Sequence, residues 1–147
     1  MSSSLVETVD VEAPVAVSWA LWSDVAEWPK FLSHVKDVVR IDNKSFSWWL
    51  SLPGAEKSFT AELTEFIPQE RIAWRTTEGV EHAGVVTFHR LSDTTSRVTL
   101  QIEYNPQDFI ERLGALTNLD STLTNYDLGQ FKRAAEKAAG GNGSPGA

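Results

Sequence analysis

His82 is the residue whose type and position best suit it to chemistry. It begins a predicted strand in which Gly84, Val86 and Phe88 follow at alternate positions, so the two-residue period of a strand places its imidazole on the apolar face. An imidazole there can act as a general acid or base in an aldol cyclisation or dehydration, or donate a hydrogen bond to a ligand carbonyl. Tyr104, on the apolar face of the last predicted strand, is the second candidate, because a buried tyrosine hydroxyl needs a partner. A structural or exposed position for His82 stays open as the alternative to a catalytic or ligand-contacting one.

Other kinds of chemistry find no support in the residue pattern. The chain has three histidines, far apart in sequence, and no cysteine, so we expect no metal site. The run Gly140 to Gly143 follows the last predicted helix and precedes none, so it is not a phosphate-binding loop. No Gly-x-Ser-x-Gly nucleophile elbow is present. We therefore expect no cofactor.

The charge of the chain argues against two classes of partner. A formal net charge of −7 and scattered basic residues do not suit binding to nucleic acids or to anionic membranes. No apolar run approaches the roughly 20 residues that a membrane span requires, and the first residues lack the pattern of a signal peptide. With no cysteine to form disulfides, the chain is compatible with a reducing compartment. We expect a cytoplasmic protein without stable membrane insertion; its protein partners cannot be inferred from the sequence.

The elements that position His82 are predicted from apolar periodicity. Leu5 to Val11 alternates as a first strand, and two short helices follow from Pro14 and from Ser23-Asp24. From Val35 to Tyr104 the chain reads as about six strands separated by short turns, which indicates an antiparallel meander with one apolar face. Residues 1–4 and 140–147 are expected to be disordered around a single domain of residues 5–139.

A long amphipathic helix is predicted for the last segment, from Pro106 to Ala139. Apolar residues recur there every three to five positions, and Gly140-Gly141 ends the helix. The stretch Thr117 to Thr122 is rich in poor helix formers and predicts a break or kink. An apolar helix stripe after an apolar sheet face has one economical arrangement: the helix lies across the sheet.

The side chains that strand and helix parity place between sheet and helix form a predicted apolar wall with a few polar groups. Small-ligand cavities usually have this character, and packing of the same residues as an ordinary core is the alternative. The predicted ligand-binding residues are Trp48, Trp74, Thr76, His82, Val86, Phe88, Leu100, Ile102, Tyr104, Leu113, Leu116, Leu123 and Tyr126.

Certain residues also carry a resemblance to a known family. They are Val11 to Pro14 with Val17 to Trp19, Leu21 to Asp24 with Trp28 to Phe31, Pro68 to Arg75, Gly84 to Phe88, and Arg97 to Leu100. Through them, residues 5 to 139 resemble the START-like, helix-grip superfamily (SRPBCC), which includes the birch-pollen allergen, and in particular its bacterial polyketide cyclase/dehydrase-like branch. The resemblance implies an α+β fold with a curved antiparallel sheet of about seven strands around a long C-terminal helix. It also implies a hydrophobic cavity that binds lipids, polyketides or other apolar molecules.

Three functions remain to be distinguished. The first is binding of a small hydrophobic molecule, such as a lipid, a polyketide or an isoprenoid-like compound, between the sheet and the C-terminal helix. The second is a cofactor-independent cyclase or dehydratase that uses His82 and Tyr104. The third is a non-catalytic interaction or stress-response protein with a filled core, for which the loop Trp28 to Phe31 is the candidate contact surface. The first function is our expectation.

Overall fold

The computed structural model describes residues 3–32, 35–52, 55–79, 81–104 and 121–140. Strands and helices follow one another along these residues in the order β1 (Ser3–Val11), α1 (Val15–Ser23), η1 (Val25–Lys30, a 3₁₀ helix), β2 (Val35–Arg40), β3 (Ser45–Leu52), β4 (Ala55–Ile67), β5 (Arg71–Glu78), β6 (His82–Arg90), β7 (Ser96–Tyr104) and α3 (Ser121–Gly140).

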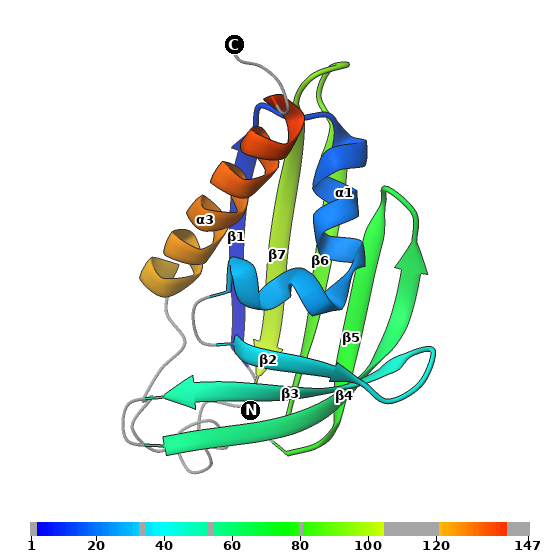
Figure 1. Cartoon of the computed structure of the whole chain (residues 1–147), viewed down its shortest axis with the longest axis vertical. Helices are drawn as coiled ribbons and strands as arrows, with labels where there is room; N and C mark the ends of the chain where they lie inside the picture. The colour runs from blue at the N-terminus through cyan, green and yellow to red at the C-terminus, as the bar shows by residue number, and fades with distance from the viewer. Residues whose placement is uncertain (1–2, 33–34, 53–54, 80, 105–120, 141–147) are drawn as a thin grey trace.

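The seven strands form one antiparallel sheet. Its spatial order is β1-β7-β6-β5-β4-β3-β2. Every strand from β2 to β7 pairs with its neighbour in sequence, and β1 pairs with β7 and forms the edge opposite β2. Figure 1 shows that the sheet curls strongly, with β2 to β4 running across the direction of β1, β7 and β6, and that α1, η1 and α3 all lie over one side of it. We call this covered side the concave face. The predicted fold class, an antiparallel sheet gripping a C-terminal helix, is confirmed.

The ends of the chain differ from the prediction at one boundary. Strand β1 begins at Ser3 and pairs from there with Tyr104, so residues 3 and 4, expected to be disordered, belong to the sheet. Helix α3 ends at Gly140, as expected from the paired glycines, and it begins at Ser121 within the described residues. The earlier part of the predicted helix, with Leu113 and Leu116, and the tail 141–147 lie outside the described residues.

A β-bulge changes which side chains of β4 face the helices. The pairing of β4 with β5 shifts register between Leu63 and Glu65, which adds one residue to β4. A bulge bends its strand and reverses the alternation beyond it. As a result Phe66, an odd number of positions from Leu63, points to the same concave side, where its ring lies 5.1 Å from that of Trp19 on α1.

Helix α3 is fixed to the molecule by an apolar stripe and by polar contacts with the chain's first strand. Leu128, Phe131 and Ala135 are fully buried at helical spacing. Glu136 accepts a hydrogen bond from the backbone N–H of Glu12 at 2.9 Å and pairs with Lys132 at 2.5 Å. Burial alone raises the pKa of Glu136, but these contacts outweigh it and hold the pKa below its usual value.

Two buried serines join α1 to β7. Ser18 and Ser96 are both fully buried, and their hydroxyl oxygens lie 2.9 Å apart. The Ser96 hydroxyl donates to the carbonyl oxygen of Ala13 at 2.8 Å, so the Ser18 hydroxyl donates to Ser96. Ser96 is therefore the central member of this chain of hydrogen bonds.

We expect replacement of the two serines by alanine to have unequal effects. Ser96→Ala leaves both the Ser18 hydroxyl and the Ala13 carbonyl buried without a partner, and should lower the free energy of unfolding by about 3 kcal/mol. Ser18→Ala leaves the bond from Ser96 to Ala13 intact and should cost about 1 kcal/mol. Urea unfolding of both variants measures the difference. Equal losses would contradict the assigned direction of the hydrogen bonds.

Candidate functional site

Four tryptophans form the centre of the concave face. We call Trp22, Trp28, Trp48 and Trp74 the tryptophan cluster; their exposed fractions are 5% or less. The Trp28 ring packs edge-on against Trp48 at 4.8 Å, Trp74 at 5.2 Å and Trp22 at 5.2 Å. Its indole N–H donates to the carbonyl of Trp22 at 2.9 Å. Helix η1 thus places Trp28 between α1 and the sheet.

The burial of η1 corrects one prediction. The loop from Trp28 to Phe31 was the candidate contact surface for a non-catalytic interaction or stress-response protein. In the structure Trp28 and Phe31 are 0% and 2% exposed, so these side chains belong to the core and offer no surface. Asp24 begins η1 by accepting a hydrogen bond from the Ala26 N–H, which turns the chain inward directly after α1.

Trp48 contributes a polar atom that has no partner among the described residues. Strand alternation turns Trp48 inward, where it is 5% exposed, and turns its neighbour Trp49 outward, where it is 43% exposed. Within the part of the chain that the structure describes, neither the buried Trp48 indole Nε1 nor that of Trp22 has a hydrogen-bond partner. Because a buried donor without a partner is costly, Trp48 Nε1 is a natural contact for an acceptor on a ligand.

The Trp74 ring lies directly over a glycine of the neighbouring strand. Trp74 on β5 and Gly84 on β6 are direct partners in the sheet, and the indole ring lies over Gly84. A Cβ atom at Gly84 would lie 2.2 Å from Trp74 Cζ2, so no other residue fits beneath the ring in this position. The glycine thus positions the tryptophan, a role that was not predicted from the sequence.

His82 lies beside Trp74 on the concave face, the face to which strand parity assigns both residues. The Trp74 N–H donates to His82 Nε2 at 3.3 Å, and the imidazole packs edge-on against the Phe59 ring at 4.7 Å. Since an indole nitrogen only donates, His82 Nε2 carries no proton in this arrangement. His82 is half-buried, which excludes the fully exposed alternative.

Thr76 acts on the backbone of His82. Its hydroxyl accepts from the His82 N–H at 3.0 Å and donates to the His82 carbonyl at 3.2 Å. The backbone pairing of β5 with β6 ends at Arg75 and Ala83. Beyond this pair, the Thr76 side chain replaces a backbone partner for His82. Predicted as a ligand contact, Thr76 is in the structure a residue that fixes the start of β6.

Tyr104 is the direct partner of His82 in the pairing of β6 with β7. The two candidate catalytic residues therefore lie opposite each other, His82 at the start of β6 and Tyr104 at the end of β7. The side chains of Tyr104 and of Leu123, at the start of α3, are not described, and Leu113 and Leu116 lie outside the described residues.

The remaining predicted wall residues divide between core and surface. Val86, Phe88 and Leu100 are buried and Ile102 packs against them as a half-buried side chain. Phe88 lies 5.5 Å from the Trp19 ring, so it packs on α1. Tyr126 was expected to face inward, but it is 55% exposed, because the buried stripe of α3 passes through Leu128, Phe131 and Ala135.

Two further properties concern the described residues only. They contain no group of three or more histidine or acidic side chains arranged to hold a metal ion. None of their helices has the length and hydropathy needed to cross a membrane.

The curled sheet gripping α3 and the aromatic concave face define a START-like, helix-grip protein. Within that class, the chain belongs to the family described as polyketide cyclase / dehydrase and lipid transport, whose model matches residues 11–133.

Similar proteins of known sequence or structure come from bacteria. An uncharacterized protein of Streptomyces lincolnensis is 37% identical over 136 residues, which cover 92% of this chain and 91% of the relative. A crystal structure from Deinococcus radiodurans has 27% identity and a TM-score of 0.72, with 91% of this chain and 98% of that chain covered. The Zhui aromatase/cyclase from a Streptomyces species has a TM-score of 0.75 over 96% of this chain and 99% of that chain. At 19% identity, the likeness to this aromatase/cyclase concerns the fold alone.

Proposed function

We propose that this protein binds a small hydrophobic molecule with a hydrogen-bond acceptor on the concave face of its sheet, beside α3. The observation that carries the proposal is the Trp48 indole N–H, which is buried in an aromatic wall and has no partner among residues 3–32, 35–52, 55–79, 81–104 and 121–140. A ligand carbonyl, ether or phenol oxygen would satisfy it, while the rings of Trp48, Trp74 and Phe59 would contact the apolar body of the ligand. The description of the family, which includes lipid transport, supports the same kind of ligand.

A second candidate is a cyclase or dehydratase, favoured by the register that pairs His82 with Tyr104. The hydrogen bond from Trp74 occupies His82 Nε2, so this atom becomes available as a base only when that bond breaks. Because binding needs no such rearrangement, we place binding first. A His82→Ala variant whose turnover of a polyketide substrate equals that of the wild type would eliminate the enzyme candidate.

The filled-core candidate is supported by the close contacts among Trp28, Trp48 and Trp74. Native mass spectrometry of protein purified without detergent separates it from the binding proposal. A co-purifying apolar adduct supports binding and gives the ligand class.

A matched pair of variants tests the binding proposal with a defined probe. Prodan, a neutral naphthyl ketone whose emission reports hydrogen bonding to its carbonyl, is titrated into wild type, Trp48→Phe and Trp49→Phe. Trp48→Phe keeps an inward aromatic ring and removes only the N–H, so we expect prodan to bind about tenfold more weakly and to emit at shorter wavelength. Trp49→Phe changes the adjacent residue on the outer face and should bind as wild type does. Equal affinity in Trp48→Phe and wild type, or no prodan binding and no adduct, would overturn the proposal.

A further inference from the structure

A hollow lies on the opposite side of α1 and η1 from α3. It has a volume of about 450 Å³ and lies between the end of α1, the β2–β3 hairpin and the bulged end of β4. In Figure 1 these elements lie to the right of η1, whereas α3 lies to the left. We call it the hairpin pocket; its lining residues are Ser23, Arg40, Asn43, Lys44, Phe46, Leu63, Thr64, Glu65 and Phe66.

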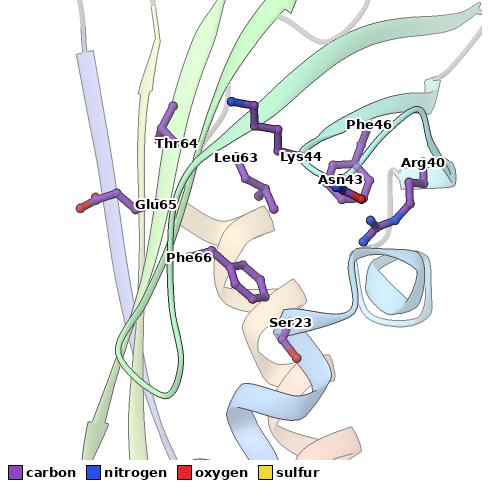
Figure 2. A pocket seen from close by; sticks show the side chains of 9 residues that line it. All are labelled: Ser23, Arg40, Asn43, Lys44, Phe46, Leu63, Thr64, Glu65 and Phe66. Carbon is purple, nitrogen blue, oxygen red and sulfur yellow. The ribbon is translucent and has the colours of Figure 1, made fainter.

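The hairpin pocket has an aromatic and aliphatic floor. Phe46 is buried at the edge of the core, Leu63 is half-buried, and Phe66 is 47% exposed. Figure 2 shows Leu63 and Phe66 pointing into the same space from β4, the arrangement that the bulge produces. One side of the Phe66 ring packs against Trp19 of α1, and the other side faces the pocket. A flat apolar group is the natural occupant of such a floor.

The polar groups of the pocket favour an anion. The Arg40 guanidinium lies over the Phe46 ring, with Cζ 5.2 Å from the ring centre. A guanidinium over an aromatic ring can still present its N–H groups to a carboxylate, which they fit in pairs. Among the described residues no carboxylate pairs with Arg40, and Lys44 adds a second positive charge to the lining.

The acidic residues near the pocket are already engaged. Glu65, the one acidic residue in the lining, accepts from Arg71 Nε at 2.6 Å, and Figure 2 shows its carboxylate pointing away from Arg40. Asp42, in the hairpin turn, accepts hydrogen bonds from the backbone N–H groups of Lys44 and Ser45. Although the net charge of the chain is −7, neither Arg40 nor Lys44 forms a salt bridge within the described residues.

From this combination we infer that the hairpin pocket binds a small aromatic carboxylate. The ring system of this ligand lies on Phe46, Leu63 and Phe66. Its carboxylate accepts hydrogen bonds from the Arg40 guanidinium. Ser23 donates its hydroxyl to the Ala20 carbonyl at 3.2 Å, so it can accept a hydrogen bond from a hydroxyl substituent on the ligand. The pocket volume is of the size of known small-molecule sites, so a fused two-ring acid fits within it. This site lies on the same concave face but on the opposite side of α1 and η1 from α3 (Figure 1).

Naphthoate and its neutral amide, naphthamide, are the probes that test this inference. Titration of isotope-labelled protein, followed by amide chemical shifts, should move the signals of the β2–β3 hairpin and the end of β4 with naphthoate. Naphthamide should bind about tenfold more weakly, because it lacks the charge that pairs with Arg40. Shifts confined to residues around Trp48 and His82 would overturn the hairpin site.

Two arginine variants complete the test. Arg40→Gln removes the charge from an exposed side chain and should weaken naphthoate binding at least about tenfold at low salt. Arg90→Gln, at the β6–β7 hairpin where Arg90 pairs with Asp93, is the matched control and should bind as wild type does. Unchanged affinity in Arg40→Gln, or an equal loss in both variants, would refute the role of Arg40. Since Trp48→Phe should leave naphthoate binding unchanged, failure here is distinguishable from failure of the binding site beside α3.

Discussion

Replacement of Phe131 by alanine is expected to lower the free energy of unfolding by about 3–5 kcal/mol. Phe131 is fully buried in α3 and its ring lies 5.4 Å from Trp22 on α1 and 5.5 Å from Phe31 after η1. Removing it leaves a cavity where three elements meet, and their bulky neighbours cannot all move to fill it. Such a loss is a large share of the roughly 5–15 kcal/mol by which a domain is normally stable.

The same helix supplies the control for this prediction. Tyr126 is an aromatic residue of α3 that is 55% exposed, so Tyr126→Ala should change the free energy of unfolding by no more than about 0.5 kcal/mol. Urea unfolding followed by circular dichroism measures both variants. Similar losses in the two would mean that α3 does not dock through Phe131.

Gly84→Ala should have the second largest effect, a loss of about 3 kcal/mol. The new methyl group would lie 2.2 Å from Trp74 Cζ2, and the indole has little room to withdraw, because it touches Trp28 and Trp48 and bonds to His82. The strain should be relieved when the ring is shortened. We therefore expect the double variant Gly84→Ala/Trp74→Phe to be more stable than Gly84→Ala alone, by about 1 kcal/mol or more.

A glycine elsewhere in the chain controls for the loss of backbone flexibility. At Gly129 in α3 the nearest atom to a new Cβ is Arg133 Nη1 at 3.9 Å, so alanine fits without strain. Gly129→Ala should stabilise the protein by about 0.5–1 kcal/mol, because alanine is the better helix former. Thermal unfolding of the four proteins tests the set. A Gly84→Ala variant as stable as wild type would show that Trp74 can leave Gly84.

Alternation along the strands was enough to predict the fold and the facing of most site residues. Trp48, Trp74 and His82 were placed on one face by a period of two, and the structure brings them together there. The glycine at position 84, on the same parity, carried a further signal: glycine inside a strand often marks the close approach of another group. Parity gives the face of a side chain but not its neighbour, so the bond from Trp74 to His82 could not be predicted.

Where parity failed, a local backbone feature was responsible. The bulge after Leu63 puts Phe66 on the concave side, where it lines the hairpin pocket. The apolar alternation of Phe59, Ala61 and Leu63 breaks at Glu65, but a break alone does not distinguish an inserted residue from the end of a strand. Burial of Trp28 and Phe31 depends on the tight 3₁₀ turn capped by Asp24, which a helix or loop prediction does not specify. Tyr126 was assigned to the apolar face of a longer predicted helix. In the structure it is exposed, because the buried face of α3 is the one that carries Phe131.

The contacts between the two ends of the chain also determine when the protein can fold. Strand β1 pairs with β7, about ninety residues later in the chain. The N–H of Glu12 donates to the side chain of Glu136, across a sequence separation of 124 residues. Contacts of such long sequence separation form slowly, because the intervening chain must first be ordered. On the ribosome, β2 to β6 emerge with an unpaired edge and with the cover of α1 and η1 but not of α3. The nascent chain must therefore keep this edge and the uncovered part of the face from aggregating until β7 and α3 have been made.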